Sequence, residues 1–215
     1  MNILITGGLG FIGINLINKL LSNKKNKILN IDKESSFSTK NNNLLFNKSN
    51  NYKFIKIDLA KYNLLYKKID KYRPDIIFHL AAESHVDRSI KDPDNFIFSN
   101  IIGTYNLLKI SNFLFKKNKK FKFLYVSTDE VYGSLGLNEN KFFTENSNYK
   151  PNSPYSASKA SSDHFVRSYF ETHNLPAIIT NCSNNFGPYQ NKEKFIPTII
   201  SSLINKKIYQ SMVTV

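Results

Sequence analysis

The sequence has few of the residues that stabilise small secreted proteins or hold proteins in membranes. Its 215 residues include one cysteine, Cys182. A single cysteine excludes an internal disulfide and a cysteine-based zinc site, and it favours a reducing, cytoplasmic compartment. No apolar run reaches the roughly eighteen residues of a membrane-spanning helix, and residues 1–8 lack the features of a signal peptide. We therefore expect a cytoplasmic globular protein with no membrane partner and no metal.

Arginine is also scarce, although the chain is strongly basic. Lysine and arginine total 30 against 16 aspartate and glutamate, a net charge of +14, but only Arg73, Arg88 and Arg167 are arginines. Readout of base edges favours arginine, and the lysines are dispersed, usually beside asparagine. The charge is therefore expected on solvated faces, with no specific nucleic-acid partner. A basic nucleic-acid binder remains the alternative, and salt-dependent DNA binding would reveal it.

Short apolar runs alternate with amphipathic segments along the chain. The runs predict six buried strands, and the segments between them show the apolar spacing of helices. The expected strands are 3–5, 28–31, 54–57, 76–78, 121–126 and 177–180. The expected helices are 11–22, 61–72, 94–117, 153–173 and 192–205, and residues 34–51 are expected to form a loop. This alternation predicts a parallel sheet covered by helices on both faces.

Three glycines follow the first expected strand and open the first helix. Gly7, Gly10 and Gly13 form a G-x-x-G-x-x-G pattern, a spacing variant of the dinucleotide-binding fingerprint. Asp32 ends the second strand, where a carboxylate would bind the adenosine ribose and disfavour the 2′-phosphate of NADP. Lys33 weakens that preference slightly. Asp58 follows the third strand and is expected either near the adenine or at a helix N-terminus. The sequence thus predicts a Rossmann-type doubly wound α/β fold that binds NAD.

A second group of polar residues predicts catalysis. Tyr155 and Lys159 are four residues apart on an expected helix, so they share one face. A nearby ammonium, together with an oxidised cofactor ring, would lower the pKa of the tyrosine and make it a better base. Thr128, Asp129 and Glu130 follow the fifth strand, at the edge of the sheet where ligands bind. Two adjacent carboxyl groups could there act as an acid and a base.

With these motifs the chain resembles the extended short-chain dehydrogenase/reductase family, and within it the NAD-dependent epimerases and dehydratases of nucleotide sugars. The resemblance runs from Met1 to about Ile208. It rests on the segments 6–13, 79–89, 127–133, 155–159 and 181–189. Among these, the Thr128-Asp129-Glu130 triplet indicates a dehydratase, because the family's epimerases usually lack the acid pair.

The resemblance implies a set of ligand contacts. NAD would be bound by Gly7, Gly10, Phe11, Ile12, Gly13, Asp32, Lys33, Asp58, Leu59, Leu80, Ala81, Ala82, Ser99, Tyr155, Lys159 and Asn185. The nucleotide-sugar substrate would be bound by Ser84, Thr128, Asn184, Lys194 and Phe195. His85 is expected to position neighbouring groups rather than to act as a base.

The implied reaction is the dehydration of dTDP-glucose to its 4-keto-6-deoxy product, a hydro-lyase step of deoxysugar (rhamnose-type) nucleotide biosynthesis. Tyr155 would take the proton of the C4 hydroxyl while Thr128 binds its oxygen. Glu130 would remove the C5 proton, Asp129 would protonate the departing C6 hydroxyl, and Lys159 would position the nicotinamide ribose. The sequence leaves open whether dTDP-glucose or UDP-glucose is used. A 4-epimerase and an inactive NAD-binding remnant are the alternatives.

The organisation expected from the resemblance is an NAD-binding domain at 1–182 and the start of a truncated substrate-binding lobe at 183–215. The resemblance also implies a homodimer formed through the helices at 94–117 and 153–173. The expected helix at 192–205 should expose an apolar face. The tail 209–215 departs from the family pattern, and a frame change after Ile208 is a hypothesis for it.

Overall fold

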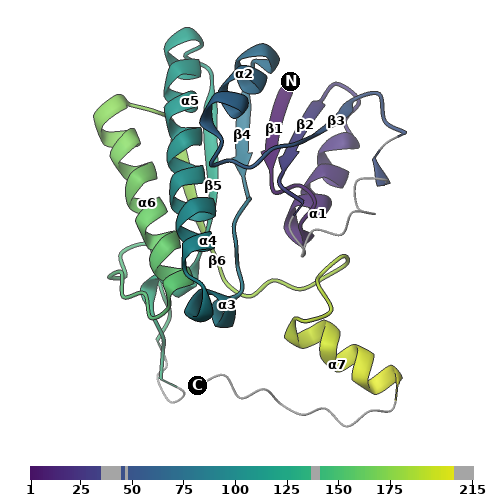
Figure 1. The fold of residues 1–215 in the computed structure, drawn as a ribbon, viewed down its shortest axis with the longest axis vertical. Coiled ribbons are helices and arrows are strands. Elements are labelled where there is room, and N and C mark those ends of the chain that lie inside the picture. Colours follow the sequence, from purple (N-terminus) through teal and green to yellow (C-terminus); the bar gives the residue numbers. More distant parts are fainter. Residues whose placement is uncertain (35–44, 47, 137–140, 206–215) are drawn as a thin grey trace.

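A computed structural model describes residues 1–34, 45–46, 48–136 and 141–205. Its centre is a six-stranded, all-parallel sheet in the order β3-β2-β1-β4-β5-β6 (Figure 1). The strands are β1 (Asn2–Thr6), β2 (Lys27–Asp32), β3 (Tyr52–Lys56), β4 (Ile76–His79), β5 (Lys122–Thr128) and β6 (Ala177–Cys182). The predicted α/β class and all six predicted strands are confirmed. The tail 209–215 and most of the predicted loop 34–51 lie outside the described residues.

Alternating side chains of the first strand fill two separate cores. Ile3 and Ile5 pack with Ile14 and Ile17 of α1 (Phe11–Leu21) on one face of the sheet. Leu4 points to the opposite face, where α2 (Tyr62–Tyr72), α5 (Gly103–Lys117) and α6 (Pro154–His173) cover the sheet. Because each face buries its own apolar layer, β1 is apolar throughout, as a central parallel strand should be.

The long helix predicted at 94–117 is present but interrupted. It begins as α4 (Asp94–Phe96), continues as a π-helical segment, η2 (Ile97–Ile102), and becomes regular in α5. The side chain of Asn100, inside η2, accepts the backbone N–H of Glu83 and donates to the Oγ of Ser158 at 2.8 Å each. The π-helical segment thus places one polar side chain between the loop after β4 and α6, as such segments often do near functional sites.

The helix α6 begins at a well-formed N-terminus. Ser153 is its N-cap, and the side chains of Ser153 and Ser156 bond each other's backbone N–H reciprocally. Pro154 occupies the first turn, where no N–H is needed. This start fixes the register of α6 and so determines which face carries Tyr155 and Lys159.

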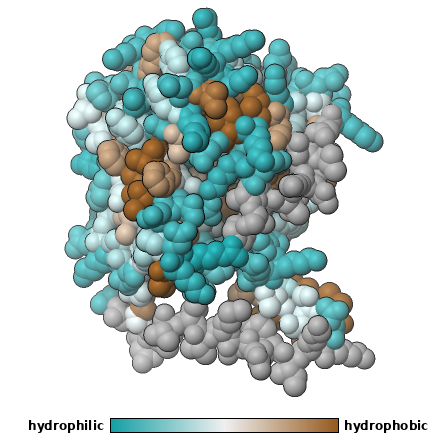
Figure 2. Space-filling view, viewed as in Figure 1, coloured by the Kyte–Doolittle hydropathy of each residue, from teal (hydrophilic) through white to brown (hydrophobic). Residues whose placement is uncertain are grey.

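Three shorter elements complete the described structure. They are α3 (Val86–Lys91), the 3₁₀ turn η3 (Asp129–Tyr132) and α7 (Phe195–Ile204). Figure 1 shows α7 beyond the carboxyl ends of the strands, apart from the sheet. As predicted, α7 exposes apolar side chains, including Leu203 and Ile204. Figure 2 shows hydrophobic surface at the lower right, where Figure 1 places α7. All strands fall within 1–182, but the domain boundary after residue 182 stays a prediction.

Candidate active site

The carboxyl ends of the strands enclose a cavity of about 290 Å³. It lies where the strand order reverses, with β2 and β3 on one side of β1 and β4 on the other, which is where ligands bind in doubly wound sheets. Its lining includes every residue predicted to contact the cofactor except Asn185. The side chain of Asn185 is exposed and donates to the carbonyl oxygen of Ser183 instead. Within the described structure, no helix is long and apolar enough to cross a bilayer.

The glycine turn forms one wall of the cavity and depends on two of its glycines. Gly7 has φ +73°, and a Cβ there would lie 2.6 Å from backbone atoms of Ala81. A Cβ on Gly13 would collide with the carbonyl oxygen of Gly7 and the Cα of Gly8. Gly7 therefore makes the turn possible, and Gly13 lets α1 approach it closely. The N-terminus of α1 at Phe11 has no side-chain cap, and its N–H groups are an anion-binding arrangement.

Asp32 lies at the carboxyl end of β2 and is held by two backbone donors. Its Oδ2 accepts the N–H of Leu9 at 3.1 Å, and its Oδ1 accepts the N–H of Glu34 at 2.9 Å. Burial raises the pKa of the carboxyl, while these two hydrogen bonds act in the opposite direction. The contacts fix a carboxylate in the cavity wall, as the sequence predicts.

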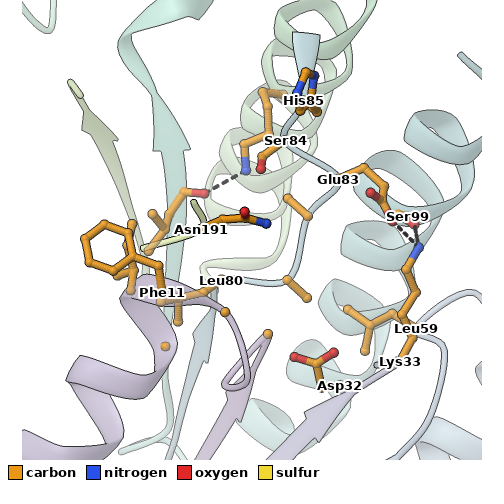
Figure 3. A pocket seen from close by; sticks show the side chains of 18 of the residues that line it. Phe11, Asp32, Lys33, Leu59, Leu80, Glu83, Ser84, His85, Ser99 and Asn191 are labelled. Atoms are coloured by element: carbon orange, nitrogen blue, oxygen red, sulfur yellow. Dashed lines mark hydrogen bonds and ion pairs between the residues drawn. The ribbon is translucent and has the colours of Figure 1, made fainter. Parts of the chain in front are cut away.

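Lys33 extends from the same strand end across the cavity wall. Its ammonium donates to the Oγ of Ser99 at 2.7 Å and forms an ion pair with Glu83 at 2.5 Å (Figure 3). Glu83 lines the cavity, but sequence analysis did not single it out. It lies within the 79–89 motif, and its pairing with a residue fifty positions earlier has no local sequence signal.

Asp58 lines the cavity together with Leu59. The Oδ1 of Asp58 accepts the N–H of Ala60 at 2.9 Å, which closes a short turn after β3. The N-cap of α2 is Lys61, so Asp58 does not cap that helix. Of the two predicted positions for Asp58, the helix N-cap is therefore wrong, and the residue lies in the cavity wall.

Tyr155 and Lys159 lie on the inner face of α6 and both line the cavity. The sequence predicts that an ammonium and an oxidised cofactor ring together lower the pKa of Tyr155, and the groups of the protein act on the same pKa. Burial raises the pKa of Tyr155, and the charge of Glu130 raises it further, while the hydrogen bond with Thr128 lowers it. The protein groups alone therefore favour the protonated phenol of Tyr155. The tyrosine contacts Thr128, the residue predicted to share its substrate oxygen.

Lys159 is buried and directed at the sheet. Its Nζ donates to the carbonyl oxygen of Val126 at 2.7 Å and lies 4.1 Å from the ring centroid of Tyr125. Burial lowers the pKa of Lys159 to about 8, although the charge of Asp163 acts in the opposite direction. Contacts with β5 thus hold the lysine beside Tyr155.

The acidic turn, Thr128-Asp129-Glu130, joins β5 to η3. The Oγ1 of Thr128 caps the turn by accepting the N–H of Glu130 at 3.2 Å. Burial raises the pKa of Glu130, the neighbouring Asp129 raises it further, and the charge of Lys194 lowers it. A carboxylate with a raised pKa is a stronger base. The acidic turn does not line the cavity itself. It contacts Tyr155, which does line the cavity.

Sequence analysis missed Asp163, a buried residue on the same helix as Tyr155 and Lys159. It is one turn beyond Lys159 on α6 and is 1% exposed. Its Oδ2 accepts from the hydroxyl of Tyr149 at 3.1 Å and from the Nδ2 of Asn181 at 3.3 Å. The spacing of four residues from Lys159 could have suggested it, because such pairs share a helix face.

The residues predicted to bind substrate are only partly brought together. Ser84 and Lys194 line the cavity, whereas Thr128, Asn184 and Phe195 do not. His85 also lines it, and its buried Nδ1 makes no hydrogen bond with the described residues. In the described structure, no group of three or more His, Cys, Asp or Glu is placed to bind a metal.

The chain is similar in sequence to known nucleotide-sugar dehydratases. The family model described as GDP-mannose 4,6 dehydratase matches residues 4–214. The dTDP-glucose 4,6-dehydratase of Haemophilus influenzae is 47% identical over 214 residues, which cover 96% of this chain and 62% of that relative. The chain therefore spans about three fifths of the length of such relatives.

Two solved structures are similar over almost the whole chain. The dTDP-glucose 4,6-dehydratase of Bacillus anthracis, in complex with NAD, has a TM-score of 0.83 and 42% identity over 96% of this chain and 62% of its own. The dTDP-glucose 4,6-dehydratase of Streptomyces venezuelae, with NAD and TYD bound, has a TM-score of 0.86 and 36% identity over 96% of this chain and 63% of its own.

Proposed function

The chain belongs to the GDP-mannose 4,6 dehydratase family, and from this membership we propose that it binds NAD and takes part in the dehydration of dTDP-glucose to the 4-keto-6-deoxy sugar. The observation that carries the proposal is the contact between the acidic turn and Tyr155 at one end of the cavity. A base for the C4 hydroxyl and a base for C5 are thereby adjacent.

The cavity fits NAD by its own features. The glycine turn leaves room beside the N-terminus of α1 for a diphosphate, and Asp32 offers its carboxylate to a ribose. Tyr155 and Lys159 lie on the same cavity wall. NAD, when bound, supplies the oxidant that takes a hydride from C4 of the sugar and later returns it to C6.

The residues of this chain would handle the protons of the reaction. Tyr155 would accept the proton of the C4 hydroxyl once the positive charges of Lys159 and the oxidised cofactor lower its pKa. Its hydrogen bond with Thr128 keeps the two oxygens together. Once C4 is a ketone, the C5 hydrogen becomes acidic, and Glu130 removes it. Asp129 gives a proton to the C6 hydroxyl, which leaves as water. When the hydride returns to C6, Glu130 gives a proton back to C5. The raised pKa of Glu130 favours its part as the base, because it increases proton affinity.

Lys159 serves binding and orientation. Its position between Tyr155 and β5 would place the ammonium beside the ribose of bound NAD. With a pKa of about 8, the side chain is mostly protonated at neutral pH and keeps its positive charge. Ser84 and Lys194 would contact the substrate, because both line the same cavity.

Homodimerisation is the proposed partnership. Apolar side chains gather on the surface of η2, α5 and α6 at Phe98, Ile102, Tyr105 and Phe165, and Figure 2 shows hydrophobic surface over these helices. The rings of Tyr105 and Phe165 pack across the two helices with centroids 5.8 Å apart. A second copy of the chain would bury this surface.

The function is tested by incubating the purified protein with NAD and dTDP-glucose or UDP-glucose. The proposal expects a product lighter than dTDP-glucose by one water, detected by mass spectrometry. A product of unchanged mass but altered C4 configuration would indicate a 4-epimerase. NAD binding without turnover of either sugar would leave an NAD-binding protein without dehydratase activity.

A further inference from the structure

Two side chains of opposite charge lie next to each other in the wall of the proposed cofactor cavity. Asp32 and Lys33 are consecutive at the end of β2, and both line the cavity. A carboxylate at this position binds the ribose hydroxyls of NAD, whereas a cation there can accommodate the 2′-phosphate of NADP. The two residues alone therefore favour different dinucleotides.

The contacts of Lys33 resolve this conflict. Its ammonium extends away from the carboxylate of Asp32, toward Glu83 and Ser99 (Figure 3). It pairs with Glu83 at 2.5 Å and donates to Ser99 at 2.7 Å. The side chain of Glu83 is only 16% exposed and that of Lys33 30% exposed, so water screens the pair less than a surface pair.

We propose that Glu83 is a cofactor-specificity residue: by holding the ammonium of Lys33, it prevents the lysine from binding a 2′-phosphate and so makes the cavity select NAD over NADP. The inference rests on the proposed function, since it assumes that the cavity binds the dinucleotide. It adds that selectivity depends on a residue outside β2, contributed by the loop after β4.

The electrostatics of the pair support this role. A 2′-phosphate that attracted Lys33 would have to displace Glu83 from it. Glu83 would then remain partly buried and unpaired beside a second anion, with Asp32 nearby, and such unpaired charges are costly. Ribose hydroxyls require no such displacement, because Asp32 can accept hydrogen bonds while the Lys33–Glu83 pair stays intact.

The test is a pair of titrations with NADH and NADPH, following the fluorescence of the reduced nicotinamide. In Glu83→Gln the ammonium is no longer neutralised, and the ratio of the NADPH Kd to the NADH Kd should fall about tenfold, the effect of one gained lysine–phosphate contact. Ser99→Ala removes the other contact of the ammonium and should lower the same ratio by a smaller factor. It also serves if Glu83→Gln does not fold.

Glu34→Gln is the matched control. Glu34 lies one residue beyond Lys33, and its carboxylate pairs with Lys56 at 2.9 Å rather than with Lys33. The substitution removes one negative charge from the same region without releasing Lys33. If mere loss of negative charge explained the change, Glu34→Gln would shift the ratio as much as Glu83→Gln, and the proposal would be wrong.

The double variant Lys33→Met/Glu83→Gln shows whether Lys33 is responsible. The proposal expects the gained NADPH affinity to disappear when the ammonium is absent. Retention of that gain in the double variant would overturn it, as would an unchanged ratio in Glu83→Gln. Failure of the wild-type protein to bind NADH would contradict the proposed function itself, whereas NADH binding without the selectivity change contradicts only the role of Glu83.

Discussion

Asn181 joins the last strand of the sheet to the acidic turn, because its Nδ2 lies 3.2 Å from the carbonyl oxygen of Thr128 and donates to it. The same Nδ2 lies 3.3 Å from the Oδ2 of Asp163 on α6. One amide group therefore connects the turn that carries Asp129 and Glu130 with the helix that carries Tyr155 and Lys159.

Replacing this amide should destabilise the protein. In Asn181→Ala the buried carboxylate of Asp163 loses a donor, and the free energy of unfolding should fall by about 1–3 kcal/mol. Unfolding in urea, followed by circular dichroism, measures the change. Asn205→Ala is the control, because Asn205 donates to Ser201 from an exposed position and its loss should change stability by about 0.5 kcal/mol or less. Equal effects of the two substitutions would contradict the bridging role of Asn181.

Asp32 should determine the affinity for NAD. Asp32→Asn keeps an oxygen that can accept from a backbone N–H but removes the charge that favours the ribose hydroxyls. We expect NAD affinity to fall by at least about tenfold, as the loss of a charged hydrogen bond implies. Isothermal titration measures it. Asp70→Asn is the control, because Asp70 pairs with Lys117 at 3.5 Å and does not line the cavity. Unchanged affinity in Asp32→Asn would remove the assignment of Asp32.

Lys159 should make the free energy of unfolding change with pH in the alkaline range. Burial lowers its pKa to about 8 in the folded chain from the ordinary lysine value of 10.5, so between these values the unfolded state binds more protons. The contribution of Lys159 to stability is therefore present above the unfolded pKa and is lost as pH falls through about 8. The unfolding free energy of the wild type, relative to Lys159→Met, should rise by roughly 2 kcal/mol from about pH 8 to about pH 10. A pH-independent difference would contradict the lowered pKa.

The apolar surface of α5 and α6 should hold two copies together. Phe165→Glu places a charge in that surface, and we expect the protein to sediment as a monomer where the wild type sediments as a dimer. Phe142→Glu is the control, because Phe142 is 88% exposed and lies in the segment before α6, outside the proposed interface. A wild-type monomer, or a Phe165→Glu dimer of unchanged stability, would refute the interface.

The strands and the glycine turn could be predicted because their signals are local. A buried parallel strand such as Ile3-Leu4-Ile5 is apolar on both faces, and the glycine spacing reports close backbone approaches. The interruption of the helix at 97–102 could not be predicted in the same way. It coincides with contacts of Asn100 to Glu83 and Ser158, residues distant in the sequence.

The charges and pKa values of the site were the hardest features to predict from the sequence. The spacing of Tyr155 and Lys159 correctly placed both on one wall of the cavity. It could not indicate that Lys159 donates to Val126, or that burial dominates the pKa of Tyr155. Both depend on how deeply α6 packs against β5, which is a property of the tertiary structure.

The dehydration mechanism is tested by the reaction of dTDP-glucose in D₂O, with NAD present and the product analysed by mass spectrometry and NMR. The wild type should form a 4-keto-6-deoxy product that carries solvent deuterium at C5. Glu130→Gln should form the C4 ketone without exchanging C5, and Tyr155→Phe should leave the sugar unoxidised. Deuterium at C5 at the wild-type rate in Glu130→Gln would show that another residue is the base, and a product that retains its C6 hydroxyl would contradict dehydration itself.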